Sequence, residues 1–150
     1  MLSPELARYT GYLVRRAQQV HAALWQRELL SESTSVQFGV LSLLDGNPGI
    51  DQRALGELLQ LDRSTIADLV TRMERRGLLH RVRDDGDRRR NILSLTGSGR
   101  EELASLLPHA ERVNELLVSG LGERDRAELN RLLGILLDSR AAQDATDPRS

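Results

Sequence analysis

The chain has 150 residues, of which 39% are hydrophobic and only 3% are aromatic, and its formal net charge is −1. This length fits one ordinary domain, and an apolar content rich in leucine and poor in aromatic residues favours helices over a β-sandwich. The lack of cysteine excludes disulfides, thiolate metal sites and cysteine nucleophiles. The net charge alone argues against a nucleic-acid binder, although all 21 basic residues are arginine, the residue preferred for phosphate and base-edge contacts.

The residue pattern offers no catalytic, metal or cofactor site. The three histidines are scattered and lack the spacing of metal ligands. No Ser–His–Asp order, carboxylate pair or strand–glycine–helix phosphate motif stands out, so we expect no enzymatic activity. No apolar run approaches the roughly 20 residues that span a bilayer, and the first residues do not resemble a signal peptide, so we expect a cytoplasmic protein.

Residues 4–30 have the apolar periodicity of one long helix. We predict Ser3 as its N-cap and Pro4 as its first residue. Two stripes of side chains run along this helix at helical spacing. They consist of Leu6, Leu13, Ala17, Val20 and Leu24, and of Val14, Gln18, His21 and Trp25. A helix with two such stripes packs against two surfaces, which indicates a partner chain.

Capping residues mark the next two helices. Thr34 and Gln37 have the spacing of a capping box, which predicts a helix that starts directly after it and ends at the turn over residues 46–49. Asp51 then predicts the start of a short helix over about residues 52–60.

A further helix is predicted from Asp62, its N-cap, to about Arg76, with Gly77 as the left-handed residue that ends it. After this glycine the apolar period changes from that of a helix to that of strands. Residues 78–83 and 91–95 predict a β-hairpin with a long, charged tip between them.

The remainder of the chain is predicted to be helical. Apolar positions continue from about residue 100 to Gly122, with Pro108 expected to kink or interrupt the helix. A last helix is predicted over about residues 123–140, followed by a polar tail over residues 141–150.

This order of elements predicts a winged helix-turn-helix, a mainly α fold with a two-stranded β-hairpin wing. In such a fold the helix over residues 62–76 enters the major groove of DNA. Its exposed side chains are hydrogen-bond donors and acceptors of the kind that read base edges. The candidates are Arg63, Ser64, Thr65, Asp68 and, one turn later, Arg72. The hairpin tip would reach the backbone or the minor groove.

The position of the charges supports this interpretation. Residues 71–90 contain eight arginines and four acids, a local charge of +4 within a chain that totals −1. Arg88 and Arg89 lie at the tip of the predicted hairpin, beside Asp87. A charged loop is often only a solvated surface, but this one coincides with the turn, helix and hairpin order.

Several motifs together resemble the MarR family over roughly residues 5–140. They are Gln37-Phe38-Gly39-Val40-Leu41, Leu55-Gly56-Glu57-Leu58-Leu59, Asp62-Arg63-Ser64-Thr65, Arg75-Arg76-Gly77-Leu78-Leu79 and Asp87-Arg88-Arg89 followed by Leu93-Ser94-Leu95-Thr96. Each motif is weak alone, but they occur in the order of the family. The sensing of peroxide through cysteine, known in the family, does not apply to a chain without cysteine.

The resemblance implies a homodimeric repressor that binds a pseudo-palindromic DNA operator. It implies a winged-helix part over about residues 34–96 and dimerisation helices over about residues 4–30 and 100–140. The wing pattern Asp-x-Arg falls on Asp87 and Arg89, so that the arginine would reach DNA and the aspartate would hold the loop. The family resemblance also implies release from DNA by a small phenolic or aromatic acid, and the chain resembles the protocatechuate-responsive repressors of aromatic-acid catabolic operons.

The first predicted helix contains the residues that suit such a ligand. His21 and Trp25 lie one turn apart and can frame an aromatic ring. A desolvated arginine pairs strongly with a carboxylate. Arg15 lies nearer this edge than Arg16, so we expect Arg15, His21 and Trp25 to bind the effector. The alternative is that the aromatic side chains of this helix fill a dimer interface.

A helical protein-interaction module without DNA binding is the rival function. It leaves the hairpin and its arginines unexplained. A steep salt dependence of binding to DNA would distinguish the two, because phosphate contacts release counterions.

Overall fold

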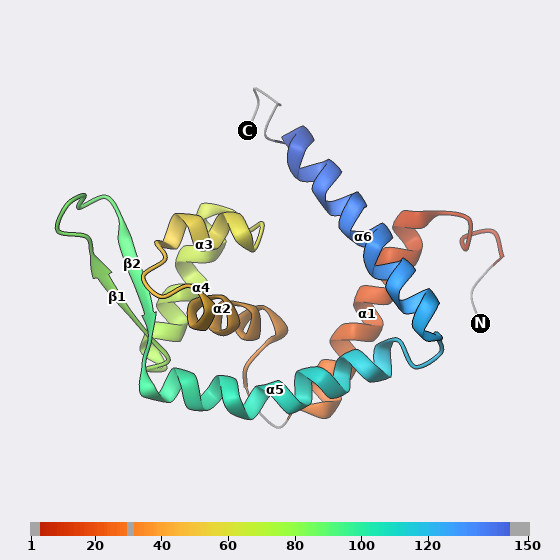
Figure 1. The fold of residues 1–150 in the computed structure, drawn as a ribbon, viewed down its shortest axis with the longest axis horizontal. Coiled ribbons are helices and arrows are strands. Elements are labelled where there is room, and N and C mark those ends of the chain that lie inside the picture. Colours follow the sequence, from red (N-terminus) through yellow and green to blue (C-terminus); the bar gives the residue numbers. More distant parts are fainter. Residues whose placement is uncertain (1–3, 30–31, 145–150) are drawn as a thin grey trace. The chain divides into compact units, whose positions relative to one another are not determined.

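The computed structural model describes residues 4–29 and 32–144 (Figure 1). Within these ranges the elements follow one another as α1 (Thr10–Glu28), α2 (Ser35–Gly46), α3 (Gln52–Leu58), α4 (Arg63–Arg75), β1 (Leu79–Arg83), β2 (Asn91–Leu95), α5 (Gly97–Leu117) and α6 (Glu123–Asp144). The chain forms two compact units, which divide after Val113, so that α5 runs from the first into the second. The predicted mainly α fold with a two-stranded wing is confirmed.

Helix α1 begins at Thr10, so the predicted start at residue 4 is wrong. The backbone N–H of Tyr9 donates to the carbonyl of Leu6 at 3.0 Å and closes a turn before the helix. Residues 4–8 form turns instead of helix, although Leu6 continues the apolar period of α1. Apolar periodicity alone therefore overestimated the helix. The predicted cap Ser3 lies outside the described residues.

The core of the first unit lies among α2, α3, α4, α5 and the hairpin (Figure 1). Its fully buried side chains come from every one of these elements. They are Val40, Leu41, Leu55, Val70, Met73, Leu79, Leu93, Leu106 and Val113. Burial of a leucine side chain contributes about 1.5–3 kcal/mol, so this shared core holds α4 and the wing in fixed positions relative to each other.

The predicted caps of α2, α3 and α4 are confirmed. Thr34 and Gln37 form the complete capping box, in which each side chain accepts a backbone N–H of the other residue, at 3.2 and 3.0 Å. Asp51 accepts from the N–H of Ala54, and Asp62 accepts from that of Thr65, both at 2.8 Å. Each N-cap of this kind is worth about 1 kcal/mol.

Helix α3 ends at Leu58, two residues earlier than predicted. The chain then turns at Gln60, a non-glycine residue with a left-handed backbone of φ +53°. The N–H of Leu61 donates to Gly56 at 2.9 Å and that of Gln60 to Glu57 at 3.2 Å, which is the bonding pattern of a Schellman motif. The same pattern follows α4, where the predicted Gly77 has φ +72°.

The wing is an antiparallel pair in which Leu79 faces Leu95 and Arg83 faces Asn91. A short bridge attaches it to the segment before α3, because the N–H of Leu93 donates to the carbonyl of Ile50 at 2.9 Å. The hairpin is therefore attached to the helix-turn-helix through the middle of β2, and the loop between the strands lies at its far end (Figure 1).

Helix α5 starts where two backbone segments meet closely. Thr96 caps it by accepting the N–H of Gly99 at 2.9 Å, while its own hydroxyl donates to the carbonyl of Gly77 at 2.6 Å. Gly99 is buried, and it lies so close to the carbonyl of Leu78 that a Cβ at this position would overlap the carbonyl oxygen. Pro108 lies inside α5 without interrupting it, so the proline ends no helix here.

In the second unit α6 begins at Glu123, as predicted, and extends to Asp144. The large apolar side chains of α6 up to residue 139 are all exposed within this unit. They are Leu129, Leu132, Leu133, Ile135, Leu136 and Leu137. Among the described helices, none is long and apolar enough to span a membrane.

A polar network joins the C-terminal end of α4 to α2 and α5. Arg76 donates to Ser33 Oγ at 3.2 Å and to Gln37 Oε1 at 3.3 Å, and its guanidinium lies 3.5 Å from the carboxylate of Glu102. Ser33 Oγ in turn donates to Glu102 at 2.5 Å. The network fixes the end of α4 on the two helices beneath it.

Replacement of Arg76 by alanine is expected to lower the free energy of unfolding by about 1–3 kcal/mol, because hydrogen bonds to charged groups are lost in a half-buried site. Urea unfolding followed by circular dichroism measures this change. Arg75→Ala is the matched control, since Arg75 lies at the same helix end and takes no part in the bonds of the network. Equal effects of the two substitutions would contradict a role of the network.

Candidate nucleic-acid interface

The first turn of α4 is organised by one carboxylate. Oδ1 of Asp62 accepts the N–H of Thr65 at 2.8 Å and the hydroxyl of Ser64 at 2.7 Å, and Oδ2 accepts the hydroxyl of Thr65 at 2.7 Å. These bonds, led by the backbone N–H of Thr65, hold the pKa of Asp62 far below its usual range. The side chain therefore remains a carboxylate at all physiological pH values.

The predicted reading residues lie together on the outer face of α4. Arg63, Ser64, Thr65, Asp68 and Arg72 are all solvent-accessible, and none of them is buried. The opposite face, with Ile66, Leu69, Val70 and Met73, is buried in the core. The helix thus presents a polar face of donors and acceptors on a rigid support, as base readout requires.

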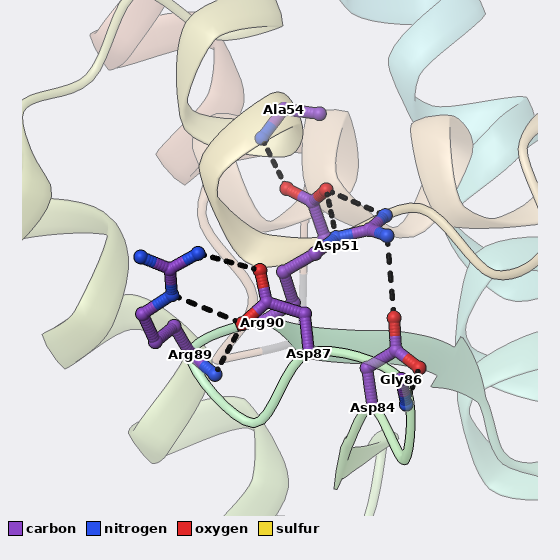
Figure 2. Close-up of polar contacts among 7 residues, drawn as sticks. All are labelled: Asp51, Ala54, Asp84, Gly86, Asp87, Arg89 and Arg90. Atoms are coloured by element: carbon purple, nitrogen blue, oxygen red, sulfur yellow. Dashed lines mark hydrogen bonds and ion pairs between the residues drawn. The ribbon is translucent and has the colours of Figure 1, made fainter.

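At the wing tip, Asp87 holds Arg89 (Figure 2). The carboxylate accepts the backbone N–H of Arg89 at 3.1 Å and its guanidinium at 3.0 and 3.2 Å. These bonds, the guanidinium first, lower the pKa of Asp87. The side chain of Arg89 is nevertheless 91% exposed. Arg88 beside it is also exposed, so the tip carries two accessible cations.

Arg90, which the sequence did not single out, anchors the wing to α3 (Figure 2). Its guanidinium donates to Asp51 Oδ2 at 3.0 and 3.1 Å and to Asp84 Oδ2 at 3.2 Å. Asp51 also caps α3 through its other oxygen. The pKa of Asp51 is lowered, first by the N–H of Ala54 and then by Arg90, against the effect of burial. One carboxylate thus connects the start of α3 to the base of the loop.

A cleft of about 760 Å³ separates the wing loop from the starts of α3 and α4. Its walls carry four arginines. The lining residues are Asp51, Gln52, Arg53, Ala54, Glu57, Arg63, Ile66, Asp87, Arg89, Arg90 and Asn91. Arg53 and Asn91 were not predicted. Arg53 could have been found as a cation in the first turn of a helix, where backbone N–H groups attract anions.

The predicted ligand residues are only partly brought together. The indole N–H of Trp25 donates to the carbonyl of Ser33 at 2.9 Å, and its ring lies 5.7 Å from Phe38 and 6.1 Å from His21 between centroids. Trp25 is 7% exposed. Its donor is therefore used within the fold, and the ring of His21 beside it is only partly exposed.

Arg15 lies on an earlier turn of α1 and is exposed. Its guanidinium carbon lies 5.6 Å from the centroid of the Tyr12 ring, a cation–π contact. A second cavity, of about 400 Å³, contains Trp25 in its lining but neither Arg15 nor His21. It is lined by Ala22, Trp25, Gln26, Leu29, Glu32, Ser33, Thr34 and Ser35.

The arrangement on α4 and the wing can hold an extended polyanion. Arg63 of α4 and Arg89 of the wing tip face a common cleft, and the hydroxyls of Ser64 and Thr65 lie beside Arg63 in the first turn of the helix.

His80 and His109 are exposed outside this site. In the described residues no three His, Asp or Glu side chains group to hold a metal ion.

Comparisons with known proteins agree with this geometry. The model of the MarR family matches residues 33–90. The HTH-type transcriptional repressor NicR of Pseudomonas putida is 32% identical over 136 residues, which are 90% of this chain and 86% of NicR.

Two solved structures extend the comparison to the whole fold. The PcaV transcriptional regulator of Streptomyces coelicolor, in complex with its natural ligand, has a TM-score of 0.87 and 41% identity, and the match covers 93% of this chain and 99% of PcaV. BpsR of Bordetella bronchiseptica, whose DNA binding is regulated by 6-hydroxynicotinic acid, has a TM-score of 0.84 and 29% identity, with 88% and 95% covered.

Proposed function

Because this chain belongs to the MarR family and is a transcriptional regulator of the MarR type rather than an enzyme, we propose that it is a homodimeric repressor. In this proposal it acts in the cytoplasm, binds a pseudo-palindromic operator, and is released by a small aromatic carboxylate. The observation that carries the proposal is the accessible polar face of α4 beside a wing tip with two accessible arginines.

The proposed DNA contacts divide by chemistry. Residues of α4 would read base edges in the major groove, and the wing tip would reach the backbone or the minor groove. The proposed set is Arg63, Ser64, Thr65, Asp68, Arg72, Asp87, Arg88 and Arg89. Asp87 contributes by holding Arg89 and not by touching DNA, since a carboxylate would be repelled by phosphate.

The proposed dimer rests on the terminal helices. Leu13, Val14 and Val20 of α1 are exposed within the first unit, and the apolar side chains of α6 are exposed within the second. Contiguous exposed apolar surface marks an interaction site. A second copy of the chain would cover both, and its two-fold symmetry would place the recognition helices about one DNA turn, roughly 34 Å, apart.

The proposed effector is a small aromatic carboxylate, and the target is an operon for the catabolism of such compounds. The regulation of BpsR by 6-hydroxynicotinic acid, an aromatic carboxylate, supports this class. In our proposal the rings of His21 and Trp25 contact the effector, and Arg15 pairs with its carboxylate. Binding would disfavour the spacing of the dimer that fits DNA.

The DNA-binding proposal is tested by a mobility shift with the DNA upstream of the protein's own gene. Log affinity is expected to fall linearly with log salt between about 50 and 200 mM, with a slope of about −0.9 for each phosphate contact. Binding that is insensitive to salt, or no binding at all, would favour a protein-interaction module instead.

Arg15→Ala is expected to raise the hydroxybenzoate concentration needed for half-release of the operator by roughly 10- to 100-fold, because a charge-assisted pair of about 1.5–3 kcal/mol is removed. Titration of the operator complex with hydroxybenzoates measures this shift. Arg16→Ala is the control, since Arg16 donates to Gln19 on the same helix. Unchanged release by Arg15→Ala would refute the assigned role.

A further inference from the structure

The two hydroxyl groups in the first turn of α4 share one feature: the carboxylate of Asp62 holds both of their protons. Ser64 Oγ donates to Oδ1 and Thr65 Oγ1 donates to Oδ2, each at 2.7 Å. A hydroxyl has one proton and two lone pairs. In this arrangement both hydroxyls therefore present only lone pairs to an approaching molecule.

Only the hydrogen-bond donors of DNA can bond to hydroxyls that present lone pairs alone. The major-groove donors are the amino groups of adenine and cytosine, whereas guanine N7 and O6 and thymine O4 are acceptors, as are all phosphate oxygens. We propose that Asp62 sets Thr65 as a hydrogen-bond acceptor, so that Thr65 selects adenine or cytosine and disfavours guanine, thymine and phosphate. This inference rests on the proposed binding of DNA by α4.

The carboxylate is well suited to this role because it remains charged. The backbone N–H of Thr65 and the two hydroxyls hold its pKa far below neutral pH. A negative charge beside DNA lowers affinity, and asparagine caps a helix as well as aspartate does. An asparagine has one acceptor oxygen, so it could cap the helix but could not accept from both hydroxyls as the carboxylate does.

The substitution Asp62→Asn separates the two hydroxyls. The N–H of Thr65 keeps the amide oxygen in the position of Oδ1, where it still accepts from Ser64. The amide nitrogen then replaces Oδ2 opposite the Thr65 hydroxyl, and it donates where Oδ2 accepted. Thr65 must accept from the amide, and its own proton becomes free to donate to a base. The helix cap is retained, while the polarity of one side chain is reversed.

The experiment is selection from a randomised DNA duplex library with the full-length wild type, Asp62→Asn and Thr65→Val, each shown by thermal unfolding to be folded. The wild type is expected to select adenine or cytosine at one position in each half-site. Asp62→Asn is expected to shift that position toward guanine or thymine by about tenfold. Thr65→Val is expected to lose the preference for adenine or cytosine there, because the valine side chain can neither donate nor accept.

Ser64 provides an internal control, because its partner Oδ1 is retained in Asp62→Asn. Ser64→Ala should thus change the selected bases equally in both backgrounds. The inference is overturned if Asp62→Asn and the wild type select the same bases at every position, or if Thr65→Val leaves selection unchanged. A wild type that binds without enriching any sequence would instead overturn the proposed sequence-specific function, and the inference with it.

Discussion

Replacement of Gly99 by alanine is expected to destabilise the winged-helix unit by about 3 kcal/mol or more, because overpacking of a buried site forces the backbone to shift. A Cβ at this position would overlap the carbonyl oxygen of Leu78 and press on the side chain of Leu95. Neither the carbonyl nor the glycine can move freely. The carbonyl of Leu78 accepts the N–H of Thr96, which caps the same helix.

Gly97→Ala is the matched control, since Gly97 opens the same helix and a Cβ there meets nothing within 4 Å. It is expected to change the free energy of unfolding by less than about 1 kcal/mol, in the stabilising direction, because alanine has a higher helix propensity than glycine. Urea unfolding of the two variants compares the midpoints. Similar midpoints would show that the start of α5 can move away from Leu78, contrary to the packing described.

Arg89→Ala is expected to cost about 1–3 kcal/mol of operator affinity per protomer, because it removes one of the two accessible cations of the wing tip. It is also expected to make the slope of log affinity against log salt shallower by about 0.9 for each phosphate that the guanidinium neutralises. The measurement is a salt series of mobility shifts with the operator. The control for folding is the urea midpoint, which should stay unchanged because the Arg89 side chain is 91% exposed.

Arg90→Ala gives the contrasting result. Its guanidinium is engaged by Asp51 and Asp84, so its removal is expected to lower affinity by releasing the base of the loop, with little change in the salt slope. The urea midpoint is expected to fall. A salt slope that decreases as much in Arg90→Ala as in Arg89→Ala would mean that Arg90 itself touches DNA.

The features that could be predicted from the sequence are those set by neighbours along the chain. The caps at Thr34, Asp51 and Asp62 follow from a three-residue spacing, and Gly77 from the left-handed residue after a helix. The wing followed from a change of apolar period. Strands and helices were therefore predicted in the right order, although the start of α1 lies at Thr10 and not at residue 4.

The features that were missed depend on contacts between distant segments. Arg90 and Asp51 are 39 residues apart, and nothing in either motif indicates their pairing. The end of α3 was misplaced because Gln60 adopts a backbone usually taken by glycine. The sequence placed Trp25 beside a ligand, and only the fold shows that its N–H bonds to Ser33.

The pairing of Asp51 with Arg90 also affects how this loop can vary between related proteins. The pair lies at the base of the loop, and apart from it the hydrogen bonds given for residues 84–90 join residues of the loop itself. Insertions or deletions at the tip would change how far the wing reaches without disturbing its attachment to Asp51. Evolution can therefore adjust the length of DNA that this protein covers while α3 and α4 keep their positions.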